Sequence, residues 1–444
     1  MSKHFRPWKI DEAQLLPACV QDYVGKDHLA RFVVALVRES LDLGRIVASY
    51  ASSLGQPPYH AVMMVALLLY AYCCGIYSSR RIAKACRERV DFMLIVANDA
   101  PDFRTISDFR KRHLDALSGL FVQVLQLCRR AGLIKLGHVA LDGTKIKANA
   151  SKLKAMSYAR LQQREAELQA EVDRWLAAAE AADAEEDKLY GRDKRGEEMP
   201  DWIADKEKRL EKIREAKAAL EAEAKAAAAA KAKAAREAEA KRRAQGRRKP
   251  GKPAAPPRAE PEAKAQRNFT DPDSRILKSK DGYIQGYNAQ AAVDGQAQII
   301  VAQGLTNSQS DQDQLTPRLD DIEADLGVRP DELSADAGFA SEANFAVLVA
   351  RDVEGYIATA RAKHPANTKR TPTGVLTRAM RAKLRRAGWR SRYRLRKQIV
   401  EPVFGQIKQA RGFRQFLLRG MEKVRAEWAM ICTAHNLLKL AKAA

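Results

Sequence analysis

The chain is organised around the stretch Gly137-His138-Val139-Ala140-Leu141-Asp142-Gly143-Thr144-Lys145-Ile146-Lys147-Ala148-Asn149. Its apolar run, Val139 to Leu141, predicts a short buried strand. Asp142 would then lie where the strand leaves the core, at its carboxyl end, which is where ligands bind in open α/β sheets. We interpret Asp142 as the first of three acidic metal ligands, in a site that Lys145 and its neighbours make positive. The alternative is an Asp-Gly turn that closes a hairpin.

The composition points to a polyanionic partner. The 444 residues include 78 Lys and Arg against 55 Asp and Glu, a formal net charge of +23, which favours nucleic acid over the other candidate, a membrane surface. No run of about 18 apolar residues is present, so we expect no spanning helix, and the N-terminus lacks the apolar core of a signal peptide. The six cysteines lack metal-ligand spacing and fit free buried thiols in a reducing cytoplasm.

Residues 1–135 predict an all-α N-terminal domain that binds DNA. Two of its helices, near 78–90 and 105–113, begin at capping residues and carry basic side chains at helical spacing. Together they resemble a helix-turn-helix; the alternative is that these are ordinary solvated faces of a helical bundle. The candidate DNA-binding residues of this region are Arg80, Arg81, Lys84, Arg87, Arg104, Arg110 and Lys111.

Residues 152–265 predict a long helical insertion. Ala, Glu, Lys and Arg dominate from Arg160 to Lys241, a composition that favours helix. Partial apolar stripes indicate two antiparallel helices joined near 191–200, and the Pro-rich segment 250–261 should be extended or disordered. The insertion is either an arm that bridges DNA or dimerises the protein, or a tolerated surface insertion, since long loops cost little closure entropy.

Residues 136–151 and 266–444 predict the catalytic domain. After the first strand and the insertion come two strands around the tight-turn signal Asp294-Gly295, and then helices alternate with strands up to a last helical stretch at 396–442. A hairpin followed by alternating helices and strands, with acids at strand ends, matches a ribonuclease H-like fold. We therefore predict an α/β fold with a mixed sheet flanked by helices.

Two further acids repeat the logic of Asp142. Asp336 ends a short apolar strand, and Glu401 precedes Pro402 near the expected start of the last helical stretch, with Lys408 two turns further on. Mg²⁺ and Mn²⁺ prefer oxygen ligands, and two such ions can activate a water or a 3′-hydroxyl and stabilise the leaving oxygen of a phosphodiester. The alternative is three ordinary surface acids. Arg411 and Arg414 would extend the positive surface.

Several sequence words outside the insertion occur together in one family. They are Leu141-Asp142-Gly143-Thr144-Lys145-Ile146-Lys147-Ala148-Asn149-Ala150-Ser151, Gly286-Tyr287-Asn288-Ala289-Gln290, Ala335-Asp336-Ala337-Gly338-Phe339 and Val400-Glu401-Pro402-Val403-Phe404-Gly405-Gln406-Ile407-Lys408. With these words the chain resembles a DDE transposase of bacterial insertion sequences, which joins an N-terminal helical domain to an integrase-like catalytic core.

The resemblance implies that Asp142, Asp336 and Glu401 bind two Mg²⁺ or Mn²⁺ ions and that Lys408 contacts DNA near the cleaved strand. The family's tyrosine and arginine before the glutamate are replaced here by Arg394 and Lys397, with Tyr393 one place off. Lys397 can meet a phosphate as a point charge, without the bidentate fork of arginine.

The activity implied is cleavage at the element's terminal inverted repeats and 3′-hydroxyl strand transfer into double-stranded target DNA. The resemblance also implies a homodimer in the DNA complex and a location at the bacterial nucleoid. Two other functions stay open: a stand-alone nuclease on the same fold, which cuts but does not join, and a non-catalytic DNA-bridging protein.

Overall fold

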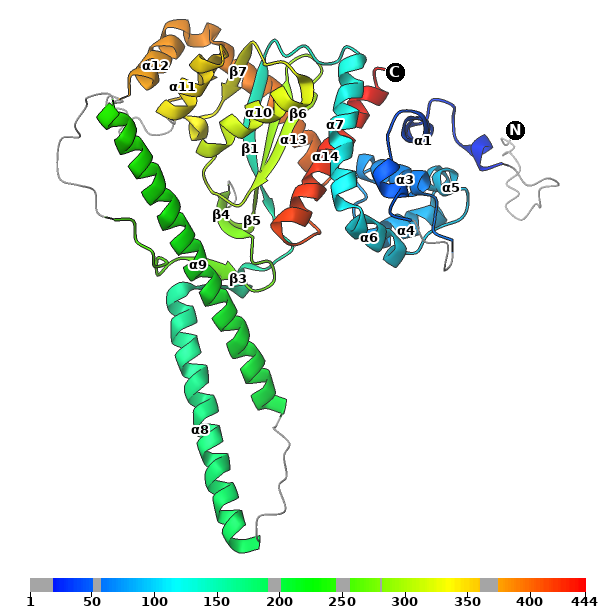
Figure 1. The fold of residues 1–444 in the computed structure, drawn as a ribbon. Helices are drawn as coiled ribbons and strands as arrows, with labels where there is room; N and C mark the ends of the chain where they lie inside the picture. Colours follow the sequence, from blue (N-terminus) through cyan, green and yellow to red (C-terminus); the bar gives the residue numbers. More distant parts are fainter. Residues whose placement is uncertain (1–18, 51–56, 191–200, 245–255, 280–281, 360–373) are drawn as a thin grey trace, which may run out of the picture.

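The computed structural model describes residues 19–50, 57–190, 201–244, 256–279, 282–359 and 374–444 (Figure 1). The expected connection near 191–200 and the first half of the Pro-rich segment, residues 250–255, lie outside the described residues. All six cysteines are free thiols; four of them are buried, whereas Cys19 is exposed and Cys74 is partly exposed. Over the described residues, no helix is long and apolar enough to cross a membrane.

A mixed six-stranded sheet forms the centre of the fold and confirms the predicted α/β class. Its order is β4-β5-β1-β7-β8, and β6 pairs with β5 beside β4. The central strand β1 is antiparallel to β5 and parallel to β7, which in turn is parallel to β8. The strands are β1 (Val139–Lys147), β4 (Arg275–Ser279), β5 (Gly282–Asp294), β6 (Ile300–Thr306), β7 (Glu332–Ala335) and β8 (Glu354–Ile357).

The strand β1 is longer than its apolar run. The buried part covers Val139 to Leu141, but pairing with β5 continues as far as Lys147. Asp142 is therefore inside a strand, neither at its carboxyl end as expected nor in an Asp-Gly turn. Pairing with β7 nevertheless stops at Leu141, so Asp142 lies where its parallel neighbour ends.

Helices flank the sheet, and all but α12, which lies in a segment expected only to be basic, follow the order that the sequence predicted. They are α10 (Leu315–Leu326), α11 (Glu342–Ala350), α12 (Val375–Ala387), α13 (Leu395–Gly405) and α14 (Met421–Ala441). The stretch expected as one helical unit at 396–442 is thus two helices. A π-helical segment at Gln406–Ala410 ends the first of them, and an irregular segment separates it from α14.

The N-terminal region is all-helical. Its apolar helix α3 is buried on every side, because eleven of its thirteen residues are buried. An unpredicted helix, α5, lies in the chain between the two basic helices α4 and α6, so these are not joined by the short turn of a helix-turn-helix. The helices are α1 (Leu29–Glu39), α2 (Gly44–Val47), α3 (Ala61–Cys73), α4 (Ser79–Glu88), α5 (Val90–Val96), α6 (Phe103–Arg112) and α7 (Leu114–Arg130).

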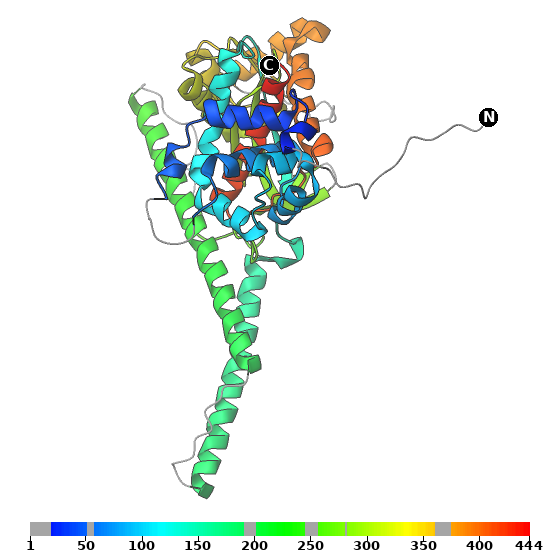
Figure 2. The same ribbon diagram turned by 90° about the vertical axis from the view of Figure 1, so that its right-hand side faces the viewer.

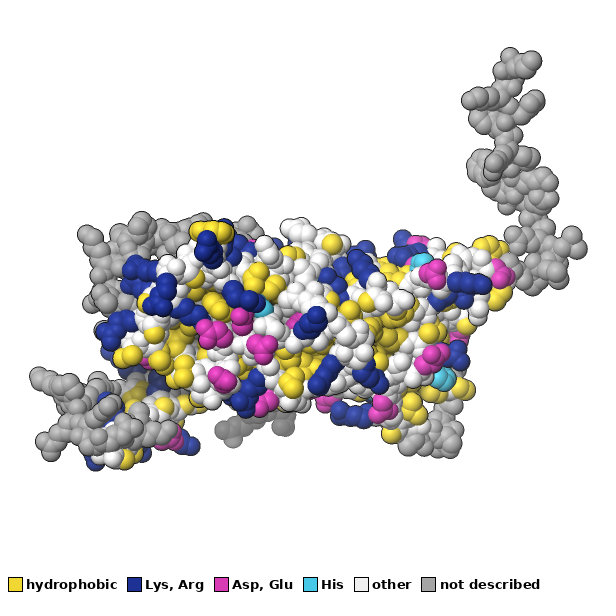
Figure 3. All heavy atoms as spheres, turned by 90° about the horizontal axis from the view of Figure 1, so that it is seen from above, with side chains coloured by type: hydrophobic (Ala, Val, Ile, Leu, Met, Phe, Trp, Pro, Cys, Tyr) yellow, Lys and Arg dark blue, Asp and Glu magenta, His cyan; other side chains and the backbone are white. Residues whose placement is uncertain are grey.

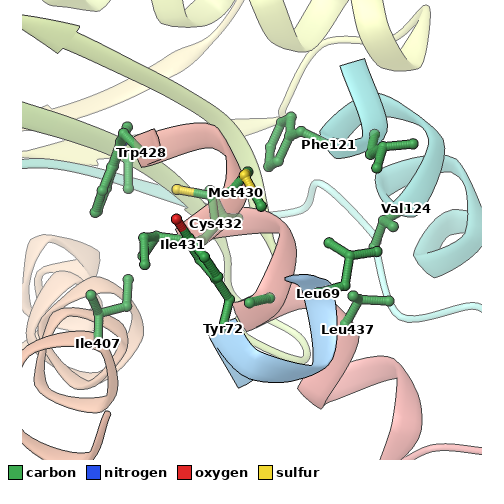
Figure 4. Packing of buried hydrophobic residues seen from close by; sticks show 14 of the residues in the cluster. Leu69, Tyr72, Phe121, Val124, Ile407, Trp428, Met430, Ile431, Cys432 and Leu437 are labelled. Carbon is green, nitrogen blue, oxygen red and sulfur yellow. The ribbon is translucent and has the colours of Figure 1, made fainter. Parts of the chain in front are cut away.

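One hydrophobic core joins the N-terminal helices to the sheet. Helix α14 packs against β6 on one side and against α7 and α3 on another. Figure 4 shows Tyr72 of α3 and Phe121 of α7 lying against side chains of α14. Trp428 is fully buried and donates from Nε1 to the carbonyl of Gln290, at 3.1 Å. The division into domains at 1–135, 136–151 with 266–444, and 152–265 therefore stays a prediction.

The insertion forms a pair of long helices that project from this body (Figures 1 and 2). They are α8 (Tyr158–Tyr190) and α9 (Asp201–Ala244). A small separate core that includes Leu161, Leu168 and Ile213 holds them together, and Glu165 pairs with two basic residues of α9. At the base, β2 (Ala155–Ser157) pairs with β3 (Gln266–Asn268), which brings the two ends of the insertion together.

Candidate metal centre and DNA-binding surface

Two of the predicted acids lie side by side where the parallel pairing of β1 with β7 ends. Leu141 of β1 is in register with Ala335 of β7, so Asp142 and Asp336 are the next residues on adjacent strands. Asp142 accepts a hydrogen bond from the amide of Gly143, and Asp336 accepts one from the amide of Gly338, both at 2.8 Å. The sheet thus fixes both carboxylates at one edge of its centre.

The charge on Asp142 is unfavourable in these surroundings. Burial raises the pKa of Asp142 to about 6, the nearby guanidinium of Arg396 opposes that rise, and the carboxylates of Asp336 and Asp311 add to it. Clustered carboxylates repel each other, and a bound cation would relieve that repulsion. The residues around Asp142 therefore form a site that favours positive charge.

Arg396 supplies positive charge within the protein itself. Its guanidinium donates to Asp142 at 2.6 Å and to Glu401 at 3.2 Å, with only 13% of the side chain exposed. Its Nε is buried and has no hydrogen-bond partner, and its guanidinium carbon lies 6.0 Å from the ring centre of Tyr393. Arg396 thus contacts two of the acids and Tyr393 lies near Arg396, each one place earlier in the sequence than the family pattern has its arginine and tyrosine.

Glu401 is carried by α13, at its seventh residue rather than near the helix start. The following Pro402 is inside the helix and lacks the amide that would bond to the carbonyl of Gln398. That carbonyl instead accepts from Nε2 of Gln298 at 3.0 Å, which offsets the loss. Glu401 remains half-exposed at 49%, so its carboxylate has access to solvent.

The three predicted acids are brought toward one region without forming a ready metal cage. Within the described part of the chain, no three His, Cys, Asp or Glu side chains are already arranged to hold a metal ion. Asp142 and Asp336 are close enough to influence each other's charge, while Glu401 reaches Asp142 through Arg396. The oxygen donors fit hard cations such as Mg²⁺, with Arg396 in the place between two of them.

Sequence reasoning missed two residues of this region, Arg396 and Asp311. Asp311 begins the short segment that leads into α10, and its Oδ1 accepts from Asn288 at 2.5 Å and from Gln290 at 2.6 Å. Both amides belong to the word Gly286-Tyr287-Asn288-Ala289-Gln290, which was a signal for this region. For Arg396 the available signal was Tyr393, because both residues lie one position before the tyrosine and arginine of the family pattern.

The predicted DNA-binding residues divide into exposed and internal groups. Arg110 is a correction, because it is buried and donates to Tyr72, to the carbonyl of Tyr77 and to Ser79, where no phosphate can reach it. Arg411 likewise turns inward, toward His435. The exposed candidates are Arg80, Arg81, Lys84, Arg87, Arg104, Lys111, Lys397 and Arg414.

Two predicted lysines lie along β1. The ammonium group of Lys408 donates to Thr144 and, at 2.9 Å, to the carbonyl of Lys145. Lys145 is largely buried and pairs with Asp311 at 3.4 Å. Lys145 is three residues after Asp142 on β1, and Lys408 contacts the same strand, so both lysines make the mouth of the site positive.

A further basic surface surrounds α12. Lysine and arginine side chains are numerous over this end of the molecule when it is viewed from above (Figure 3). The helix is anchored by Glu342, which accepts from the amides of Leu376 and Thr377. The exposed arginines of α12 and of the segment that follows it, together with Trp389, form what we call the α12 surface: Arg378, Arg385, Arg386, Trp389, Arg390, Arg392 and Arg394.

The sheet is mixed, two acids follow the end of its central parallel pairing, and basic surfaces surround them. These features define a ribonuclease H-like protein, a class of proteins that process nucleic acids. Two family models match the chain: a transposase domain (DUF772) at residues 18–112 and a transposase DDE domain at residues 258–437. These two transposase domains, one near each end of the chain, are consistent with a DDE transposase of insertion sequences, as the resemblance implied. No curated protein and no solved structure matches it.

The central strand lies outside both matched ranges. The DDE match begins at residue 258, after the insertion, whereas Asp142 is on β1. The sheet topology connects them, because β1 pairs along nine residues with β5 and along three with β7. Helix α7, which packs against α14, also lies between the two matches.

Proposed function

We propose that this transposase cuts DNA at the ends of its element and joins the freed 3′-hydroxyl ends to target DNA, with Asp142, Asp336 and Glu401 as the metal ligands. The observation that carries the proposal is the convergence of these acids on one region, with Asp142 and Asp336 on adjacent strands and Glu401 linked to Asp142 by Arg396. The raised pKa of Asp142 supports it, because such a carboxylate favours a cation neighbour.

The three carboxylates would hold two Mg²⁺ or Mn²⁺ ions, which supply Lewis-acid chemistry at a phosphodiester when bound. The chain's own residues perform the remaining tasks. The sheet holds Asp142 and Asp336 in place, and Lys408, fixed on β1 through Thr144, presents positive charge to the DNA backbone. Arg396 neutralises the acids and is suited to bind a phosphate once it is released from them.

The exposed basic residues would bind the DNA itself. The predicted set on α4 and α6 and the α12 surface lie on separate parts of the fold, so we infer that they contact different segments of double-stranded DNA. The protein would act as a homodimer on its inverted repeats, in the bacterial cytoplasm at the nucleoid. Binding through phosphate contacts predicts a steep dependence on salt.

The test uses the full chain, DNA carrying the element's terminal inverted repeats, and Mg²⁺ or Mn²⁺. Strand cleavage followed by joining to a target plasmid is expected, and Asp142→Asn, Asp336→Asn and Glu401→Gln should each abolish both steps. Cleavage without joining would identify a stand-alone nuclease. Intact cleavage in all three variants would show that the acids are not the catalytic ones.

A further inference from the structure

Asp311 is a fourth carboxylate beside the proposed site. It is linked to the sheet by its Oδ1, which accepts from Asn288, from Gln290 and, at 3.4 Å, from Lys145. Asn288 and Gln290 are fully buried on β5, so these donors have little freedom to move. Three donors to one oxygen hold the carboxylate in place, and they therefore also fix the direction in which its second oxygen, Oδ2, points.

That second oxygen lies near Asp336. A Cβ atom built on Gly338 would be 3.2 Å from Oδ2 of Asp311 and 2.9 Å from Oδ1 of Asp336. Both oxygens therefore border the same space beside Gly338, and divalent ions such as Mg²⁺ prefer oxygen ligands of this kind. Glycine at position 338 keeps this space free of side-chain atoms.

An independent observation that points to a ligand here comes from Asn288. Its Oδ1 is buried and has no hydrogen-bond partner. A Cβ on Gly143 would lie 2.9 Å from this oxygen and 2.6 Å from Oδ1 of Asp311, so the orphaned oxygen lies beside the carboxylate of Asp311. A buried acceptor without a partner destabilises the fold, and a hydrated cation nearby would relieve that cost.

We propose that Asp311 is a further ligand of the divalent cation that Asp336 binds, with Oδ2 as the donor atom. Asn288, Gln290 and Lys145 are its positioning residues. The inference rests on the proposed function, because it extends the same metal centre by one carboxylate. It also explains why positions 143 and 338 are both glycine. Each glycine borders the carboxylate of Asp311 so closely that a side chain there would displace it.

The experiment titrates the full chain with Mn²⁺, in the absence of DNA, by calorimetry. Asp311→Asn should weaken Mn²⁺ binding at least about tenfold, the size seen when a metal's supporting shell is lost. Asp313→Asn is the matched control: this acid is two residues away in the same segment but exposed, and its loss should leave Mn²⁺ affinity unchanged. Thermal unfolding in EDTA identifies any variant that has failed to fold.

A second variant tests the same point without removing a carboxylate. Gly338→Ala places a methyl group between Asp311 and Asp336 and should also weaken Mn²⁺ binding. If the unaltered protein binds Mn²⁺ and both variants bind it equally well, the role of Asp311 is refuted while the proposed function stands. If the unaltered protein binds no Mn²⁺ at all, the metal centre of the proposed function fails, and this ligand with it.

Discussion

Replacing Arg396 with glutamine should make the protein bind divalent cations more tightly. Arg396 pairs with Asp142 at 2.6 Å and with Glu401 at 3.2 Å, so a metal ion that uses these two carboxylates must displace the guanidinium. Arg396→Gln removes the competing charge and keeps a side chain of similar length. The same change leaves Asp142 without its internal cation when no metal is present.

The size of the effect follows from the burial of the pair. Arg396 and Asp142 are 13% and 17% exposed, and breaking a buried pair costs about 3–5 kcal/mol. Because Glu401 is half-exposed, solvent weakens its pairing with Arg396 and lowers the cost of displacing the guanidinium. We therefore expect a cation to bind the variant about 2 kcal/mol more favourably than it binds the unaltered protein. Since about 1.4 kcal/mol is a factor of ten, Mn²⁺ affinity should rise roughly 10- to 100-fold.

The assay is a Mn²⁺ titration by calorimetry, accompanied by thermal unfolding in EDTA and in saturating Mn²⁺. Arg396→Gln should unfold at a lower temperature in EDTA and recover most of that loss with Mn²⁺. Lys397→Gln is the control, because it removes the same charge from the exposed neighbouring position and should alter neither quantity. Equal or weaker Mn²⁺ binding by Arg396→Gln would refute the displacement of Arg396 by metal.

Three other outcomes are expected. Burial raises the pKa of Glu427 from 4.5 to about 7. Between these pH values the folded protein holds one proton more than the unfolded chain, so the free energy of unfolding falls by about 3 kcal/mol as pH rises through them. Glu427→Gln should flatten this part of a stability profile measured by denaturant unfolding. Gly143→Ala should cost about 1–3 kcal/mol through overpacking, measured by unfolding against the open position Gly119→Ala. Arg385→Ala with Arg386→Ala should weaken binding to DNA of any sequence and reduce its salt slope by about two, as seen by fluorescence anisotropy.

The regular elements could be predicted because their patterns are local. The apolar run of α3, the stripe of Leu315, Leu319 and Ile322 on α10, and the alternation of short strands with helices each show in the sequence, and each is present. Their order also sufficed for the fold class, because few arrangements bury a hairpin and alternating helices around one core. The family resemblance was confirmed by the two transposase domain matches.

Features that depend on tertiary pairing escaped prediction. The second half of β1, from Asp142 to Lys147, is polar and reads as a loop, and it is a strand because β5 provides the hydrogen bonds. Helix α5 has only seven residues, mostly apolar, and such a run fits a buried strand equally well. Arg110 looked like a surface residue because helical spacing does not reveal that the face it shares is packed against α4.

The site residues divide by the same rule. Asp142, Asp336 and Glu401 belong to recognisable words, and their roles remain predictions. Asp311 stands among polar residues with no pattern of its own, and only the position of β5 brings Asn288 and Gln290 to it. Arg396 could not be distinguished from its basic neighbours, because the direction of its side chain depends on where α13 begins.

Some site residues are held rigidly by the sheet and others are carried on α13, which explains how a cation could replace Arg396 without unfolding the protein. Asp142 and Asp336 are fixed by strands in the middle of the sheet, so they cannot move apart to accommodate an ion. Arg396 and Glu401 lie five residues apart on the single helix α13, and Glu401 is the most exposed of the three acids that Arg396 could share with a metal. Rotation of these two side chains is enough to open the site, so metal loading should proceed as a local rearrangement on α13, with the guanidinium released toward solvent, where the DNA backbone would lie.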